Sequence, residues 1–254
     1  MGRHRHLLLD IGAMASFAGL IALPVWFAVC AIGPKMGLLE GHYALDTLTL
    51  SWGLALSILV LAIAAGSGVL LILARRYDRE WPQGSWVVAA SLVVALLAFA
   101  LTLLGGVRQS AHPAVTEVTT DAEQPPGFTS ALILRRGVHA HRVSEGDFHP
   151  DMMIEAVQFD APPEAVFDAV LGIARDARWR VGTVARNRLM VELTIESFWY
   201  AQTDDVVIAI RETQAGGSRL DYRASARAGV RDGGRNARRL ARLEREIRVR
   251  LERD

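Results

Sequence analysis

The chain has 254 residues, of which 28 are lysine or arginine, 27 are aspartate or glutamate, and 51% are hydrophobic. Because the charges nearly balance, no global field favours nucleic acid, and we expect no nucleic acid partner. The single cysteine, Cys30, excludes an intramolecular disulfide and a zinc site built from cysteines.

The first part of the chain carries three long apolar runs, over residues 11–32, 48–74 and 86–107. Each run exceeds the roughly 20 apolar residues that cross about 30 Å of hydrocarbon. The runs predict a transmembrane anchor of three helices over residues 1–108, with the lipid bilayer as its partner. The spans lack ionisable residues near their centres, which disfavours a pore or a proton relay.

The basic residues flanking the runs predict the orientation of the chain. They are Arg3 and Arg5 before the first run, Lys35 after it, and Arg75, Arg76 and Arg79 between the second and third runs. The positive-inside rule then predicts a cytoplasmic N-terminus and, after three crossings, a C-terminal part in the periplasm of a bacterial inner membrane. A signal peptide is the alternative for the first run, which is longer than the roughly 7–15 residues of a signal h-region. Cleavage there would leave the predicted side unchanged.

Residues 109–151 are expected to form a linker and an irregular entry segment, because prolines and acidic residues occur there without periodicity. Three histidines, His139, His141 and His149, raise the hypothesis of a metal site. Their spacing fits no familiar ligand motif, so we interpret them as solvated loop histidines and expect no metal.

Residues 152–254 are expected to form a soluble domain. Alternating apolar residues predict strands over residues 153–159, 179–185, 189–195, 206–210 and 220–226, with a hairpin turn at 214–218. Apolar residues at helical spacing predict one helix ending near Ala177 and a second following Gly233 and Gly234. The order β-α-β-β-β-β-α predicts an α+β fold, a two-layer sandwich with a mainly antiparallel sheet and its helices on one face.

Several stretches are similar to a known family. They are HPAVTE (112–117), PPGF (125–128), TDDV (203–206), RLDYRASARAG (219–229) and DGGRNARR (232–239). Over most of residues 110–251 the chain resembles the bacterial domain-of-unknown-function family 1499. The resemblance implies an apolar N-terminal segment and an envelope setting, and it implies no reaction. Ala224 departs from the family, whose members commonly carry serine there, so a hydroxyl at this position cannot be essential here.

A polar row at period two lies on one face of the last predicted strand. Its members are Arg219, Asp221, Arg223, Ser225 and Arg227. Neighbouring arginines repel, so they need carboxylates or a bound anion between them, and Asp204 or Asp205 can contribute from the next strand. One interpretation is a cross-strand charge ladder. The other is a site for a lipid head group, a peptide carboxylate or a glycan, which makes all seven residues candidate ligand-binding residues.

Catalytic signatures are weak. Asp204 and Asp205 are adjacent on a strand and point to opposite faces, so they cannot share a proton. Ser225 has no histidine at triad spacing, and Gly233-Gly234 lacks the Lys-Ser/Thr of a phosphate-binding loop. We therefore predict no catalytic residue and no cofactor.

Three hypotheses remain. The first is an integral inner-membrane protein of unknown biochemical activity that presents a periplasmic ligand- or protein-binding domain, in envelope maintenance or membrane-complex assembly. The ligand would bind the arginine-bearing face or a groove beside Phe198-Trp199-Tyr200. The second is an envelope hydrolase or transferase with an unrecognised site. The third is a subunit of a larger membrane complex that docks through its spans. A deep pocket with convergent carboxylates would favour the enzyme, and a fully paired ladder would favour binding. The sequence predicts no oligomeric state.

Overall fold

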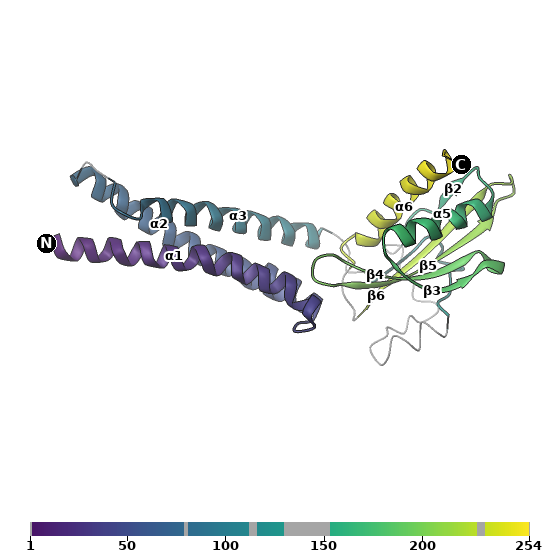
Figure 1. The fold of residues 1–254 in the computed structure, drawn as a ribbon, viewed down its shortest axis with the longest axis horizontal. Helices are drawn as coiled ribbons and strands as arrows, with labels where there is room; N and C mark the ends of the chain where they lie inside the picture. Colours follow the sequence, from purple (N-terminus) through teal and green to yellow (C-terminus); the bar gives the residue numbers. More distant parts are fainter. Residues whose placement is uncertain (1, 79–80, 112–115, 130–152, 228–231, 254) are drawn as a thin grey trace. The chain divides into compact units, whose positions relative to one another are not determined.

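The computed structural model describes residues 2–78, 81–111, 116–129, 153–227 and 232–253 (Figure 1). The chain divides into two compact units. The helical unit comprises residues 1–111 and 199–201, and the α+β unit comprises residues 112–198 and 202–254. The division after residue 111 lies close to the predicted end of the anchor at residue 108.

The helical unit contains the three long helices α1 (Gly2–Ile32), α2 (Gly53–Asp78) and α3 (Ser85–Ser110). A short 3-10 helix, η1 (Gly33–Met36), follows α1, and a π-helical segment, η2 (Tyr43–Trp52), leads into α2. Within the described residues, three helical stretches are long and apolar enough to cross a membrane: Leu7–Met36, Tyr43–Arg76 and Ser85–Ser110. The expectation of three candidate spans is confirmed.

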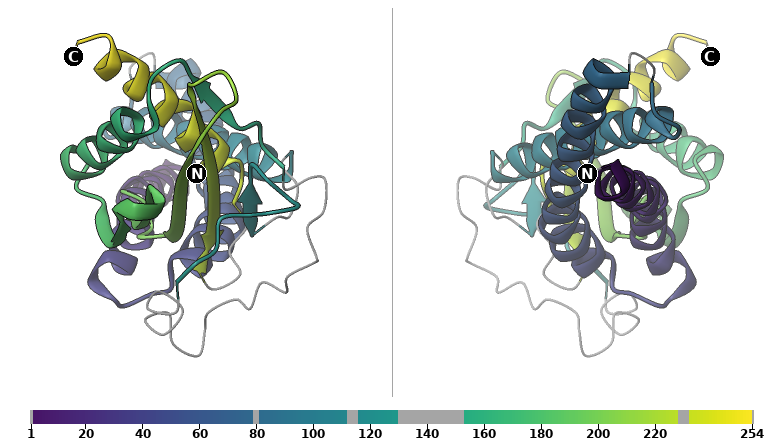
Figure 2. Two further views of the ribbon diagram at one scale, coloured as in Figure 1. Left: turned by 90° about the vertical axis from the view of Figure 1, so that its right-hand side faces the viewer. Right: turned by 90° about the vertical axis from the view of Figure 1, so that its left-hand side faces the viewer.

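Small residues bring these helices together. A Cβ atom added at Gly12 would lie 2.8 Å from Ser67 Oγ, and one added at Gly19 would lie 2.6 Å from Val60 Cγ1. The hydroxyl of Ser67 donates a hydrogen bond to the carbonyl oxygen of Gly12 at 3.2 Å. The right-hand view of Figure 2 shows the helical unit from the side on which the N-terminus of α1 lies. Small interfacial residues are typical of helices packed in lipid, because close approach provides van der Waals contact where water cannot drive association.

Large aliphatic side chains lie on the outside of the same helices. Val93, Leu97 and Leu104 of α3 are each about 60% exposed, whereas Ser91 and Ala95 on the inner side of that helix are fully buried. A water-soluble bundle has the reverse arrangement, since its apolar side chains face inward. The helical unit therefore has the surface of a membrane-embedded bundle.

The α+β unit is built on a six-stranded antiparallel sheet. Its strands are β1 (Glu117–Thr119), β2 (Val157–Phe159), β3 (Arg180–Ala185), β4 (Met190–Glu196), β5 (Thr203–Glu212) and β6 (Ser218–Ala226). The order across the sheet is β1-β6-β5-β4-β3, and β2 also pairs with β6. β1 pairs with residues 223–225 of β6 and β2 with residues 218–220, so they share one edge of that strand.

Two helices, α5 (Pro163–Asp176) and α6 (Arg235–Leu251), cover one face of this sheet (Figure 1). From α5, Phe167 and Val170 are fully buried, and from α6, Leu243 and Ile247 are buried against them. The alternate residues of the strands supply the other side of the core: Val191, Leu193, Ile195, Val206, Ile208, Ile210, Leu220, Tyr222 and Ala224. This arrangement confirms the predicted α+β class with a mainly antiparallel sheet.

β1 is a strand within the stretch expected to be a linker. It has three residues, too few to show alternation in a sequence, and all three are buried. The remainder of that stretch includes His139, His141 and His149, which lie outside the described residues. The metal hypothesis for these histidines therefore stays a prediction.

Candidate functional site

The second face of the sheet carries the polar row. β5 and β6 pair so that Asp205 lies opposite Ser225, Val207 opposite Arg223, and Arg211 opposite Arg219. On its other side, β6 pairs with β1, so Glu117 also lies opposite Ser225. Since side chains alternate between faces, the five residues of the row share the face that the helices leave uncovered. The structure thus brings together six of the seven candidate residues and places Asp204 on the opposite side.

At one end of the row, two arginines share buried carboxylates. Arg219 Nε lies 2.9 Å from Asp221 Oδ1, and Arg211 Nε lies 3.1 Å from Asp221 Oδ2. Asp121 lies 3.5 Å from Arg219 and 3.6 Å from Arg211. The carboxylate of Asp221 is fully buried, and the two guanidinium groups offset its negative charge, with a hydrogen bond from Arg219 Nε to Oδ1.

Arg223 occupies the middle of the row. Its Nε donates to Glu117 Oε1, and its Nη1 donates to the carbonyl oxygen of Pro126 at 3.2 Å. The guanidinium carbon lies 5.1 Å from the centre of the Phe128 ring, within the range of a cation–π contact. Val207 lies opposite Arg223 on β5, so neither neighbouring strand places a second cation beside it.

Arg227 ends the row in a bidentate pair with Asp205. Its Nε and Nη2 lie 2.9 Å and 2.8 Å from the two oxygens of that carboxylate. Thr194 of β4 donates a further hydrogen bond to Asp205 Oδ1 at 2.9 Å. The pairing with Asp205 raises the pKa of Arg227 above its usual value and more than offsets the effect of burial. Ser225, in the adjacent register position, is buried.

Residues 120–129 lie over this face. The carbonyl oxygen of Gln124 accepts a hydrogen bond from Arg211 at 3.2 Å, and Thr129 Oγ1 donates to Glu192 Oε2 on β4 at 2.7 Å. Thr129 also contacts Thr183 of β3 at 3.3 Å. We name residues 120–129 the covering segment. Because of it, much of the row faces the chain itself instead of open solvent.

Sequence reasoning did not identify the partners that this segment and β1 contribute. They are Glu117, Asp121, Pro126 and Phe128. The signal was present in the stretches 112–117 and 125–128, which share the family's pattern with the arginine row although about 100 residues separate them. No periodicity links such distant stretches, so the contact is visible only in the fold.

Asp204 belongs to a second cluster, on the helix-covered face. Its two oxygens lie 2.8 Å from Arg235 Nη2 and 2.9 Å from Arg239 Nη2, both at the start of α6. Asp204 is fully buried, and the two arginines are 19% and 13% exposed. The adjacent carboxylates of Asp204 and Asp205 therefore serve different faces of the sheet, as the strand geometry requires.

The entry to α6 completes this second cluster. Asp232 Oδ1 accepts hydrogen bonds from the backbone N–H of Asn236 at 3.0 Å and from its side-chain amide at 2.7 Å. Tyr222 Oη donates to Asn236 Oδ1 at 3.1 Å. Gly233 and Gly234, with φ of 57° and 70°, form the left-handed turn that this entry needs. Burial raises the pKa of the Tyr222 hydroxyl and, against the hydrogen bond from Asn236, that of Asp232.

The family follows from these observations and from a direct comparison. The sequence model of the DUF1499 family, whose description is "protein of unknown function", matches residues 117–247. The chain belongs to the DUF1499 family. The match begins at β1 and ends in α6, so the DUF1499 domain includes the covering segment and both charged clusters. No curated protein and no solved structure matches the chain.

The residues that the DUF1499 model matches thus include two charge networks. One contains Asp205 on the uncovered face of the sheet, and the other contains the adjacent Asp204 on the helix-covered face. Ala224, the position between Arg223 and Ser225, is fully buried in the core. Among the described residues, no three His, Cys, Asp or Glu side chains gather as metal ligands. The ligand-binding role of the row stays a prediction, and its charges are paired within the domain.

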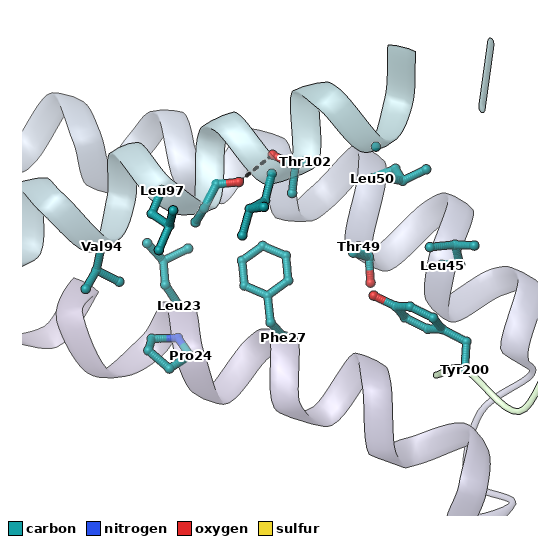
Figure 3. Close-up of a pocket in the computed structure, with 13 residues that line it drawn as sticks. Leu23, Pro24, Phe27, Leu45, Thr49, Leu50, Val94, Leu97, Thr102 and Tyr200 are labelled. Carbon is teal, nitrogen blue, oxygen red and sulfur yellow. Dashed lines mark hydrogen bonds between the residues drawn. The ribbon is translucent and has the colours of Figure 1, made fainter. Parts of the chain in front are cut away.

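A separate cavity of about 450 Å³ lies in the helical unit (Figure 3). Apolar side chains from α1, η2 and α3 line it, among them Leu23, Phe27 and Val94, together with Tyr200. Its two threonine hydroxyl groups are already engaged: Thr102 Oγ1 donates to the carbonyl oxygen of Ala98 at 2.9 Å, and Thr49 Oγ1 to that of Ala44 at 2.7 Å. This lining suits hydrocarbon and offers no chemistry for a reaction.

Proposed function

We propose that this DUF1499 protein is an integral protein of the bacterial inner membrane. Its α+β domain lies in the periplasm and binds an envelope protein or ligand without catalysing a reaction. Such a module would serve envelope maintenance or the assembly of a membrane complex.

The observation that carries this proposal is the helical unit, with three apolar candidate spans whose large side chains face outward. An odd number of crossings puts the two ends of the chain on opposite sides. Arg75 and Arg76, at the end of α2, supply basic charge next to the turn before α3, whereas η1 carries Lys35 alone. This asymmetry supports a cytoplasmic N-terminus and a periplasmic domain.

The charged face supports binding over catalysis. A hydrolase or transferase needs a group whose proton or electron pair is available to a substrate. Here the carboxylates of Asp205 and Asp221 are fully buried and bound by arginines. The half-exposed guanidinium groups of Arg219 and Arg227 are the parts of the row that an anionic group of a partner could reach.

Reporter fusions test the side of the membrane. Alkaline phosphatase fused after Asp254 should be active, because this enzyme folds only where its disulfides form, outside the cytoplasm. A cytoplasmic reporter, β-galactosidase, fused at the same position should be inactive. Fusions truncated after Gly37 and after Arg76 serve as matched controls, with phosphatase expected to be active at the first and inactive at the second.

The opposite pattern after Asp254, with inactive phosphatase and active β-galactosidase, would reject the periplasmic placement. Loss of the full-length protein from the membrane fraction after carbonate extraction would reject the integral anchor itself.

A further inference from the structure

The turn between β4 and β5 has an unusual surface for a hairpin. Its tip, residues 198–201, begins with Phe198 and Trp199, whose side chains are 70% and 60% exposed. The turn is closed below the tip by a hydrogen bond from Ser197 N to the carbonyl oxygen of Gln202 at 2.7 Å and by one from Gln202 N to Ser197 Oγ at 2.9 Å. We name residues 197–202 the aromatic turn.

The backbone of the aromatic turn is strained in a way that its sequence does not relieve. Tyr200 and Ala201 have φ of 61° and 46°, the left-handed region that glycine and asparagine adopt at low cost. Strained positions of this kind persist where another requirement outweighs the cost of the backbone conformation. Here the two strained positions, Tyr200 and Ala201, directly follow the exposed Phe198 and Trp199, and a glycine would be less strained at either of them.

The other end of the sheet provides an internal comparison. The β5–β6 turn has small and polar residues, Gln214, Ala215, Gly216 and Gly217, and its left-handed position is Gly216 with φ of 82°. This turn solves the same geometric problem with glycine and without aromatic side chains. Of these two turns, only the one between β4 and β5 carries aromatic side chains.

The strand register places the aromatic turn at the end where the chain enters the domain. Ala226 N donates to the carbonyl oxygen of Thr116 at 2.8 Å, just before β1. Ala226 pairs with Asp204 of β5, and Thr203 beside it pairs with Glu196 of β4. The start of β1 and the aromatic turn thus lie at the same end of the strands, separated by the width of two or three strands, about 10–15 Å.

The connection from the membrane helix to this edge is short. α3 ends at Ser110 and β1 begins at Glu117, so residues 111–116 join them. Six fully extended residues span at most about 21 Å. With α3 across a bilayer, this length limits how far the start of β1 can lie from the bilayer surface.

We propose that the aromatic turn is a second membrane anchor, in which Phe198 and Trp199 lie in the interfacial layer of the bilayer spanned by α3. The amphipathic ring of Trp199 favours this layer, because its apolar part meets hydrocarbon and its N–H meets water, and the apolar ring of Phe198 can bury beside it against the acyl chains. Together, the connection from α3 and the aromatic turn would hold the α+β domain against the bilayer at two points. Two points of attachment would fix the orientation of the domain. The inference requires α3 to span the membrane and is independent of which side the domain occupies.

Site-directed fluorescence in lipid nanodiscs tests this anchor in the full-length chain. In a Cys30→Ala background, Phe198→Cys and, separately, Trp199→Cys are labelled with an environment-sensitive dye. Ala215→Cys, exposed on the opposite turn, is the matched control. Nitroxide-bearing lipids should quench both labels on the aromatic turn several-fold more than the label at residue 215. Aqueous iodide should show the reverse order.

Two outcomes would overturn the proposal. Equal quenching of all three labels by lipid and by iodide would place the aromatic turn in water. Protection of the labels at 198 and 199 from both quenchers would assign the turn to a protein contact. Because the readout is the same on either side of the membrane, a negative result here leaves the reporter-fusion test intact, and the reverse also holds.

Discussion

Arg223 has the least exposed guanidinium of the arginine row. Its side chain is 11% exposed, that of Glu117 beside it is 5% exposed, and those of Arg219 and Arg227 are each 37% exposed. A buried ion pair contributes little over an apolar pair of the same shape, but removal of one partner is costly because the other charge stays in a low-dielectric site. Arg223 is thus the member of the row on which stability depends most.

We predict that Arg223→Ala destabilises the DUF1499 domain by about 3 kcal/mol, since it removes the cation closest to the buried Glu117 carboxylate. Urea unfolding of the detergent-solubilised chain, followed by far-UV circular dichroism, measures the change. Membrane insertion, which depends on the helices, should be unaffected. Arg242→Ala, at an exposed position on α6, should change stability by less than about 0.5 kcal/mol. Equal unfolding of the two variants would contradict a structural role for Arg223.

At this scale, the sequence predicts which side chains share a face but not which atoms pair. Period-two spacing correctly places Arg219 to Arg227 together, and adjacency correctly separates Asp204 from Asp205. The partners Glu117 and Phe128 were missed, because their stretch shows no alternation and lies about 100 residues away. Pairings of this kind depend on tertiary register, which no local pattern contains.

Among the elements, the residue just before β6 lies in close contact with the backbone at the end of β2. A Cβ atom added at Gly217 would lie 2.4 Å from the carbonyl oxygen of Phe159, at the end of β2. Because the obstacle is backbone, a side-chain rotation cannot remove it. β2 could not pair with this end of β6 in its present position if residue 217 carried a side chain.

We therefore expect Gly217→Ala to lower stability by about 1–3 kcal/mol through this clash. Gly127→Ala is the matched control, since a Cβ atom there would meet nothing within 4 Å. Unfolding midpoints of the two variants, measured under identical conditions, check the prediction. A Gly217→Ala midpoint equal to that of Gly127→Ala would show that β2 yields without cost.

The sequence predicts the long elements well and the short ones poorly. Helix α6 and strands β4 and β6 follow from clear periodicity over seven or more residues each, whereas the apolar run of residues 206–210 predicted only the middle of β5. β1, with three residues, contains too few positions to separate a strand from a loop. The covering segment has no regular element at all, and its place over the sheet follows from specific contacts such as Thr129 with Glu192.

At the scale of the whole molecule, the α+β unit forms its hydrophobic core and its charge networks from its own residues. The large hydrophobic cluster of the α+β unit takes all its buried members from residues 118–247. Both charge networks are also formed within that unit. Hydropathy makes the three candidate spans evident in the sequence, because the ability to cross a bilayer depends on composition over about 20 residues. The side of the membrane and the partner depend on flanking charge and surface detail, which composition does not contain.

We predict that residues 112–254, produced without the anchor, fold cooperatively as a soluble α+β domain, because they retain the complete sheet, both covering helices and their ion pairs. A single thermal transition in near-UV circular dichroism would support this. Ile247→Ala, which empties a fully buried site, should lower that transition. A fragment with secondary structure but no fixed near-UV signal would show that the core needs the helical unit.

The adjacent carboxylates of β5, Asp204 and Asp205, affect how this strand finds its pairing register during folding. In an antiparallel pair, a slip by one residue turns every side chain to the opposite face. Here a slip in either direction would put one of these carboxylates in the place of the other, so one arginine network would keep a partner and the other would lose it. The same slip would move Val206 and Ile208 out of the core, so a misaligned β5 would lose apolar burial and one set of ion pairs together.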